Sequence, residues 1–179
     1  MAAAFELFQA QGYDETTLAQ IADRARISAR TVSNYFPQKV DLLVGYRQSM
    51  LQVAEESLHR SRDADPLRRI RHALLAVARE NQRHPNGRLA QQLLARYGSY
   101  RALDHIQQRF QADLLELVRH ARLRPGVDPE LAVLALSAAH MAVIQRWASQ
   151  AHGSLASAVE RLFDQWVGGI ASGEQEPAT

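Results

Sequence analysis

The sequence contains no cysteine, only one lysine and no apolar run long enough to cross a membrane. Without cysteine, the chain has neither a disulfide nor a thiolate metal site, which favours a reducing cytoplasm. The longest apolar run, residues 131–144, is interrupted by Ser137 and His140. It is shorter than the roughly 20 residues that a membrane-spanning helix needs, so we interpret it as a buried helix. The first residues lack the basic leader of a signal peptide. We therefore expect a soluble, cytoplasmic protein with no membrane segment.

The chain also lacks a large excess of charge of either sign. The formal net charge is only +2, and residues 1–46 hold four basic and five acidic residues. Bulk charge therefore does not indicate a nucleic-acid binder, and any such binding must depend on where particular side chains lie.

Motifs for catalysis and metal binding are missing as well. The seven histidines lie at positions 59, 72, 84, 105, 120, 140 and 152. None forms an i, i+4 pair with a carboxylate partner of the kind that a helical zinc site shows. There is no cysteine nucleophile and no glycine-rich phosphate loop. We expect no metal, no cofactor and no enzymatic activity. An enzyme built on a helical body is the alternative from another class, and no motif supports it.

The apolar residues, 46% of the chain, recur with a helical period nearly everywhere. No stretch has the alternation that a strand needs, so the predicted fold is all-α. We expect about nine helices: a first that ends at Gly12, then segments at about 17–25, 28–35, 39–62, 66–83, 88–97, 100–123, 128–150 and 154–168. The domains are predicted at residues 1–46 and 47–172, followed by a flexible tail at 173–179.

A helix-turn-helix is predicted at residues 17–36. Thr17 and Gln20 form a capping-box pattern at the start of its first helix, and Ser28 can cap the second. Only a short turn around Arg26 and Ile27 separates these helices, so they must cross steeply. The second helix is then presented as a ridge that fits the major groove of DNA.

The outward face of this second helix carries residues suited to contacts with base edges. Arg30 can pair with guanine, Asn34 with adenine, and the methyl group of Ala29 can touch thymine. Hydroxyl and ammonium groups near the helix ends are suited to phosphates. The inner face is predicted to comprise Ala22, Ile27, Val32 and Phe36. The complete set of predicted DNA contacts is Thr17, Ala29, Arg30, Thr31, Ser33, Asn34, Tyr35 and Lys39. Alternatively, the polar residues form a solvated face and Tyr35 belongs to the core.

Residues 4–46 resemble the N-terminal signature of TetR-family regulators. The resemblance is carried by Gly12-Tyr13, Thr16-Thr17, Ile21-Ala22, Ala25, Ile27-Ser28, Thr31, Tyr35-Phe36, Lys39 and Leu42-Leu43. It implies a homodimeric, mostly repressive, ligand-responsive regulator of a palindromic operator. It also implies that the third helix enters the major groove and that Thr17, Tyr35 and Lys39 hold phosphates. Beyond residue 46 the likeness is one of helix number and length.

Two positions depart from the family pattern. The family usually has a basic arm before its first helix, whereas Met1 falls inside the expected first helix, so we expect weaker DNA affinity than usual. Arg26 stands where the family often has glycine, and a left-handed conformation there carries modest strain.

By the same resemblance, the C-terminal domain at residues 47–172, which we call the body, is expected to hold an effector pocket between the fifth and eighth helices. An apolar cavity with a few convergent polar groups is typical of such sites. A histidine in so apolar a helix, such as His140, is more often a core residue than a ligand-binding one. The predicted lining is His72, Arg79, Leu93, Tyr97, His105, Arg109, His140 and Trp147.

The last two helices have wide apolar stripes, and packing within a single chain would leave part of these stripes exposed. Alternatively, the stripes only complete the core of a monomer. A four-helix interface across a two-fold axis would bury them. The predicted interface is Leu131, Leu134, Ala138, Met141, Ala142, Leu155, Val159, Leu162, Phe163 and Trp166.

A third interpretation is a helical adaptor whose N-terminal domain no longer binds DNA. The regulator and the adaptor differ in how their DNA binding depends on salt. A regulator binds duplex DNA with a steep negative salt dependence, whereas an adaptor binds no duplex.

Overall fold

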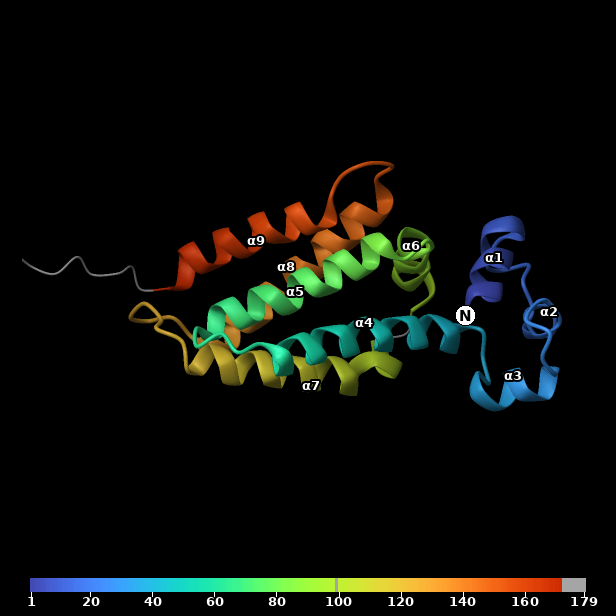
Figure 1. Ribbon diagram of the computed structural model, residues 1–179, viewed down its shortest axis with the longest axis horizontal. Coiled ribbons are helices and arrows are strands. Elements are labelled where there is room, and N and C mark those ends of the chain that lie inside the picture. Colours follow the sequence, from blue (N-terminus) through green and yellow to red (C-terminus); the bar gives the residue numbers. More distant parts are fainter. Residues whose placement is uncertain (99, 172–179) are drawn as a thin grey trace, which may run out of the picture.

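The computed structural model describes residues 1–98 and 100–171, with the side chains of residues 100–106 left aside (Figure 1). Within these ranges the chain forms nine α-helices and no strand; an isolated antiparallel bridge joins Leu123 and Ala171. The all-α prediction is confirmed. The helices are α1 (Ala2–Gln11), α2 (Leu18–Arg24), α3 (Ala29–Tyr35), α4 (Val40–Arg60), α5 (Pro66–Arg83), α6 (Gly87–Tyr97), α7 (Tyr100–Arg119), α8 (Pro129–Ser149) and α9 (Leu155–Ile170).

The molecule is elongated, with a small head at one end (Figure 1). Helices α1 to α3 form the head, and α4 runs from the head along the body. In the body, α5 packs against α4 and α9, while α8 packs against α6, α7 and α9. Helix α4 is thus the covalent connection between the head and the body.

The predicted helix starts are confirmed by their capping bonds. The Thr17 hydroxyl accepts from the Gln20 amide at 3.2 Å, and the Gln20 side chain accepts from the Thr17 amide at 2.8 Å. Ser28 accepts from the Thr31 amide at 3.0 Å. Asp128 caps α8, and the following Pro129 occupies the first turn. These side chains satisfy amides that a helix N-terminus leaves unpaired.

An aromatic cluster holds the head against the body. Phe5 of α1 lies edge-on to Tyr46 of α4, with ring centroids 5.9 Å apart. His84, just after α5, packs edge-on against both rings. Phe5 and Tyr46 are fully buried, so the core of the head is continuous with that of the body.

A buried polar network joins α4, α5 and α6 beneath this cluster. The side-chain oxygen of Asn81 accepts from the Tyr46 hydroxyl at 2.9 Å and from the Gln91 amide at 2.7 Å. Its nitrogen donates to the Val77 carbonyl at 2.9 Å. Close by, a Cβ at Gly87 would lie 1.9 Å from the Asn81 carbonyl oxygen, so only glycine fits there. The bond to Gln91 and the close approach at Gly87 together hold the first turns of α6 against α5.

Three expectations about local structure need correction. Helix α9 does not end at Gly168 but continues to Ile170, whose side chain is buried and whose carbonyl accepts from the Arg124 amide. Helix α7 ends at Arg119 because the next residues turn towards the bridge at Leu123. Ile27, predicted to face inward, is 49% exposed since the tight turn leaves it on the surface.

Candidate functional site

Helix α3 exposes the side chains that the sequence predicts to contact DNA. Val32 is its buried residue, and Phe36 packs against the core at its C-terminal end. Arg30, Ser33 and Asn34 are exposed on the opposite side. Ala29, Thr31, Tyr35 and, at the start of α2, Thr17 are exposed as well. Tyr35 is 77% exposed, so the alternative that it belongs to the core is wrong. Contact of these residues with DNA stays a prediction.

The turn before α3 adopts the strained conformation expected of it. Arg26 has a φ of 55°, in the left-handed region that glycine adopts most easily. The Arg26 amide donates to the Asp23 carbonyl, and the Ile27 amide donates to the Ala22 carbonyl. These backbone bonds hold α2 and α3 at their steep crossing and set the direction in which α3 faces.

Lys39 binds backbone carbonyl groups within the head. Its ammonium donates to the carbonyl oxygens of Tyr13, Asp14 and Thr16, and it lies 4.4 Å from the centre of the Tyr13 ring. An ammonium has three donors, and all three are used here. Lys39 therefore attaches the loop between α1 and α2 to the start of α4, and its contact with a phosphate stays a prediction.

A second fastening joins this loop to α6. The Tyr97 ring stacks on Tyr13 with centroids 4.2 Å apart, and its hydroxyl donates to the Asp14 carboxylate at 2.6 Å. That hydrogen bond is the main cause of a raised pKa at Tyr97. Tyr97 was predicted to line a pocket, but the structure turns it towards the head. We call this contact of Tyr13, Asp14 and Tyr97 the latch.

Replacing Tyr97 by phenylalanine should loosen the head without unfolding it. The variant keeps the ring that stacks on Tyr13 and loses the hydrogen bond to Asp14. We expect faster amide hydrogen exchange in α2 and α3 than in the wild type, measured by mass spectrometry, because local opening limits exchange there. An Asp14→Asn variant, which keeps an acceptor oxygen, is the matched control. Unchanged exchange in Tyr97→Phe would show that the latch does not restrain the head.

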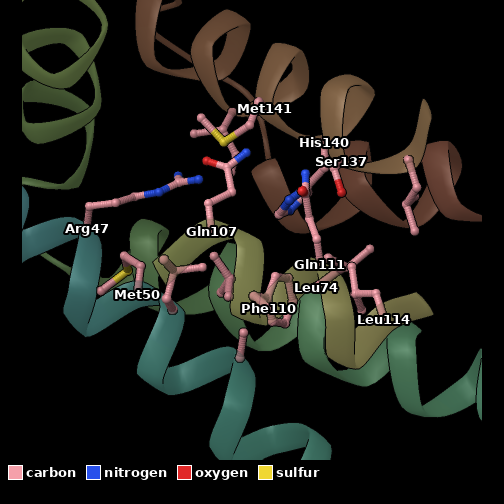
Figure 2. Close-up of a pocket in the computed structure, with 15 residues that line it drawn as sticks. Arg47, Met50, Leu74, Gln107, Phe110, Gln111, Leu114, Ser137, His140 and Met141 are labelled. Carbon is pink, nitrogen blue, oxygen red and sulfur yellow. The ribbon is translucent and has the colours of Figure 1, made fainter. Parts of the chain in front are cut away.

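A cavity of about 40 Å³ lies between α4, α5, α7 and α8 (Figure 2). Most of its lining is apolar, including Met50, Leu74, Phe110, Leu114 and Ile144. Polar side chains reach it from three helices, namely Arg47 of α4, Gln107 and Gln111 of α7, and Ser137 and His140 of α8. An apolar cavity with a few polar groups is the expected form of a small-molecule site.

Arg47 and His140 are the unusual members of this lining. They are 9% and 8% exposed. Among the described residues the Arg47 side chain forms no ion pair or hydrogen bond, and burial is the cause of its lowered pKa. Nε2 of His140 has no hydrogen-bond partner among the same residues. Burial, followed by the charge of Arg47, lowers the pKa of His140 to about 4, so His140 is neutral at pH 7.

A second cavity of about 50 Å³ adjoins the first. Arg47, Gln107 and Met141 line both, and the other wall comes from α6, including Leu94, Ala95 and Gly98. Arg47 thus lies between a largely apolar cavity and the end of α6 that carries the latch.

Most of the residues predicted for the pocket lie elsewhere. His140 is the one that lines the first cavity among those the structure describes. His72, Arg79 and Arg109 are exposed, with Arg109 3.7 Å from Glu55 on the surface. Trp147 is buried beneath the guanidinium of Arg88 and donates to the Gly153 carbonyl at 3.2 Å. Leu93 is buried in α6 outside both linings, and the His105 side chain lies outside the described part.

One side of α8 is apolar and uncovered. Leu131 and Leu134 are 63% and 58% exposed, and Ala138 and Ala142 continue the stripe along the helix. By length and composition alone α8 could cross a membrane, with 33% of its apolar window buried. A core helix passes the same test, so this is weak evidence for a membrane. The stripe matches part of the predicted interface between two chains.

The other residues predicted for the interface are less exposed, and three of them belong to the core of the monomer. Leu155, Val159 and Phe163 are buried, because this side of α9 faces the core of its own chain, where α9 packs on α5 and α8. Met141 lines the cavities. Leu162 and Trp166 are half-buried, and the Trp166 indole donates to the Ala132 carbonyl at 3.0 Å.

The sequence contains a signal for Arg47, which is not among the residues predicted for the pocket. Arg47 occupies the buried stripe of α4 formed by Leu43, Met50, Leu51 and Ala54. A charged residue at such a position is rarely buried without a role. In contrast, the bond between Tyr46 and Asn81 joins residues 35 positions apart, and the bond between Asp14 and Tyr97 joins residues 83 positions apart. No spacing in the sequence indicates either bond.

A family model described as bacterial regulatory proteins of the tetR family matches residues 1–46. The HTH-type transcriptional regulator HbdR of Aromatoleum sp. (strain CIB) is 35% identical over 78 residues, which cover 42% of this chain and 34% of that protein. The match thus spans about a third of this curated relative's length.

Solved structures resemble the whole chain. FadR of Thermus thermophilus, a TetR-family repressor in complex with lauroyl-CoA, has a TM-score of 0.70 at 24% identity, covering 99% of this chain and 96% of that one. SmeT, the repressor of the Stenotrophomonas maltophilia multidrug efflux pump SmeDEF, has a TM-score of 0.72 at 21% identity, covering 99% and 92%. At these identities the likeness shows a common fold.

Proposed function

We propose that this chain is a TetR-family transcriptional regulator, a homodimeric repressor that releases a palindromic operator when a small molecule enters its body. The observation that carries the proposal is the exposed face of α3, where Arg30, Ser33 and Asn34 stand clear of the core. A helix presented in this way fits the major groove, and these side chains are suited to base edges. Cytoplasmic location and the absence of catalysis belong to the same proposal.

Head and body are proposed as separate domains at residues 1–46 and 47–172. In this assignment the aromatic cluster around Phe5 and Tyr46 is the interface between them. Thr17, Ala29, Thr31 and Tyr35 remain proposed DNA contacts.

Dimerisation is proposed through the exposed stripe of α8. Two recognition helices must enter successive major grooves, about 34–36 Å apart, and a two-fold dimer provides that arrangement. The stripe of Leu131, Leu134, Ala138 and Ala142 combines large and small apolar residues, so a second copy of α8 can approach closely. Trp166 and Leu162, half-buried on α9, would border the interface.

Replacing Leu134 by arginine is expected to give a folded monomer. The side chain is 58% exposed in one chain, so the substitution leaves the monomer core intact while placing a charge in the proposed interface. Sedimentation velocity should show half the wild-type mass, with unchanged helical circular dichroism. Gln52→Arg, on the exposed side of α4, is the control that should stay dimeric. A dimeric Leu134→Arg protein would exclude this stripe as the interface.

Release of DNA is proposed to follow from movement of α4 and α6. Helix α4 lines both cavities and leads directly into the head, while α6 lines the second cavity and reaches the head through the latch. A ligand that binds better to one setting of the heads shifts the population towards it, by no more than its difference in affinity for the two settings. The fatty-acyl ligand of Thermus thermophilus FadR gives one example of an effector in a protein of this fold.

The test is binding of the full chain to duplex DNA that flanks its own gene, by mobility shift over a salt series. A repressor of this kind should bind selectively, protect two half-sites related by a dyad, and lose affinity steeply as salt rises. An adaptor would show no duplex binding at any salt concentration, and that result would overturn the proposal.

A further inference from the structure

We propose that the effector is an amphipathic organic anion, with an apolar body and one oxyanion head group that is bound by Arg47 and His140. This inference rests on the proposed function, because it names the class of molecule that enters the body. It is carried by two polar side chains, each more than nine-tenths buried, that line the same cavity from facing helices (Figure 2).

Arg47 carries a buried positive charge. A guanidinium stays protonated in proteins, so its burial places a positive charge among apolar groups such as Met50 and Leu51. No described carboxylate neutralises it: on α4, Glu55 lies 3.7 Å from Arg109 and Glu56 pairs with Arg60. A buried charge without a partner is costly, whereas the same charge opposite an oxyanion gains two parallel hydrogen bonds. The site therefore favours an anion over a neutral or cationic molecule.

His140 supplies the second contact. Its Nε2 atom is buried, lacks a hydrogen-bond partner and lies in the lining opposite Arg47. A neutral imidazole has one donor and one acceptor nitrogen, so it can donate to an oxyanion without needing a charge of its own. Ser137, one turn before Met141, and Gln107 and Gln111 of α7 offer further donors around the same space (Figure 2). The polar groups thus converge at one side of an otherwise apolar lining.

The apolar part of the lining determines the chemistry of the rest of the ligand. Leu74, Val77, Phe110, Leu114 and Leu136 extend from the polar groups into the core between α5, α7 and α8. A chain or ring that replaces water there gains roughly 0.8 kcal/mol for each buried CH₂ group in general. A molecule with an apolar body behind its anionic head satisfies both parts of the site at once.

The size of the cavity links binding to the head. About 40 Å³ is room for about three water molecules, at roughly 10–15 Å³ each, and is too small for such a ligand. Entry must therefore displace lining helices. Arg47 also lines the second cavity beside Leu94 and Gly98, next to Tyr97 of the latch. Displacement around Arg47 thereby reaches both α4 and the end of α6 that holds the head.

The test is calorimetric titration of the full-length protein with octanoate and three probes of equal chain length. Octanol is neutral, octylammonium is cationic, and octanoyl-CoA carries its negative charge on phosphates. Arg47→Gln removes the buried charge and keeps a long polar side chain. Arg79→Gln makes the same change on the exposed surface of α5, outside both cavities.

We expect at least one of the two anions to bind the wild type about 10- to 100-fold more tightly than octanol, the range that a hydrogen-bonded charge provides. Arg47→Gln should abolish that preference and leave octanol binding unchanged, while Arg79→Gln behaves as the wild type. The anion that loses affinity in Arg47→Gln identifies the head group as carboxylate or phosphate.

Three results would overturn the inference: an equal affinity for anion and octanol, an anion preference that survives Arg47→Gln, or no binding of any probe at millimolar concentration. Mobility shifts on the same preparations separate this failure from that of the proposed function. Selective DNA binding without anion binding overturns only the inference, and absence of duplex binding overturns the proposed function.

Discussion

Asn81→Leu is expected to destabilise the protein by about 4 kcal/mol. Asn81 is fully buried and holds the Tyr46 hydroxyl and the Gln91 amide through one oxygen. Leucine has a similar volume but leaves both groups without a partner, and each unsatisfied buried group costs about 1–3 kcal/mol. The effect should appear as a lower midpoint of urea denaturation, with the slope unchanged.

The controls separate lost hydrogen bonds from altered packing. Tyr46→Phe removes one donor and should cost only about 1 kcal/mol. The triple variant with Tyr46→Phe, Asn81→Leu and Gln91→Leu replaces the polar groups by apolar ones and should recover most of the stability. A triple variant no more stable than Asn81→Leu would mean that shape, and not hydrogen bonding, makes Asn81 important.

His140 should make the protein less stable in acid, by an amount on the order of 3 kcal/mol. Its pKa is about 4 in the folded chain against 6.5 as the ordinary value. Between these pH values the unfolded state binds the proton and the folded state does not. Stability is therefore full above about pH 6.5 and falls as the pH is lowered towards 4, below which no more is lost from this group.

The matched comparison is His140→Leu, which cannot titrate. Free energies of unfolding for both proteins, measured from pH 7 to pH 4, should diverge as the pH falls, with the wild type losing more stability. Among the residues that the structure describes in this lining, Arg47 is the other charged group, and it stays protonated over this range. Parallel curves would show that His140 is hydrated or paired in the folded protein.

The helices and the head follow from local features of the sequence. Capping at Thr17, Ser28 and Asp128 depends on residues two or three positions apart, and the amphipathic periods fix the helices within a few residues. The exposed face of α3 follows because Val32 and Phe36 fix its inner side. The end of α9 was harder to predict, since burial of Ile170 outweighs the low helix propensity of Gly168 and Gly169.

The cavity could not be predicted in the same way. Its lining comes from four helices whose relative rotation depends on packing, so residues such as His72 and Arg79 on α5 turned to the solvent while Leu74 and Val77 turned inward. Lys39 shows the same limit. Its ammonium binds the carbonyls of Tyr13, Asp14 and Thr16, which lie more than 20 positions away in the sequence, so no local pattern predicts these contacts.

The central claim is that the exposed face of α3 recognises DNA, and the most direct test is the affinity of an Arg30→Ala, Asn34→Ala double variant for the wild-type binding site. The matched control is Arg60→Ala with Gln52→Ala, which makes the same change of charge on the exposed side of α4. Two base contacts contribute about 1–3 kcal/mol each, so we predict at least a 30-fold loss of selective affinity in the α3 variant and none in the control. Equal, selective binding by the folded double variant would contradict the claim.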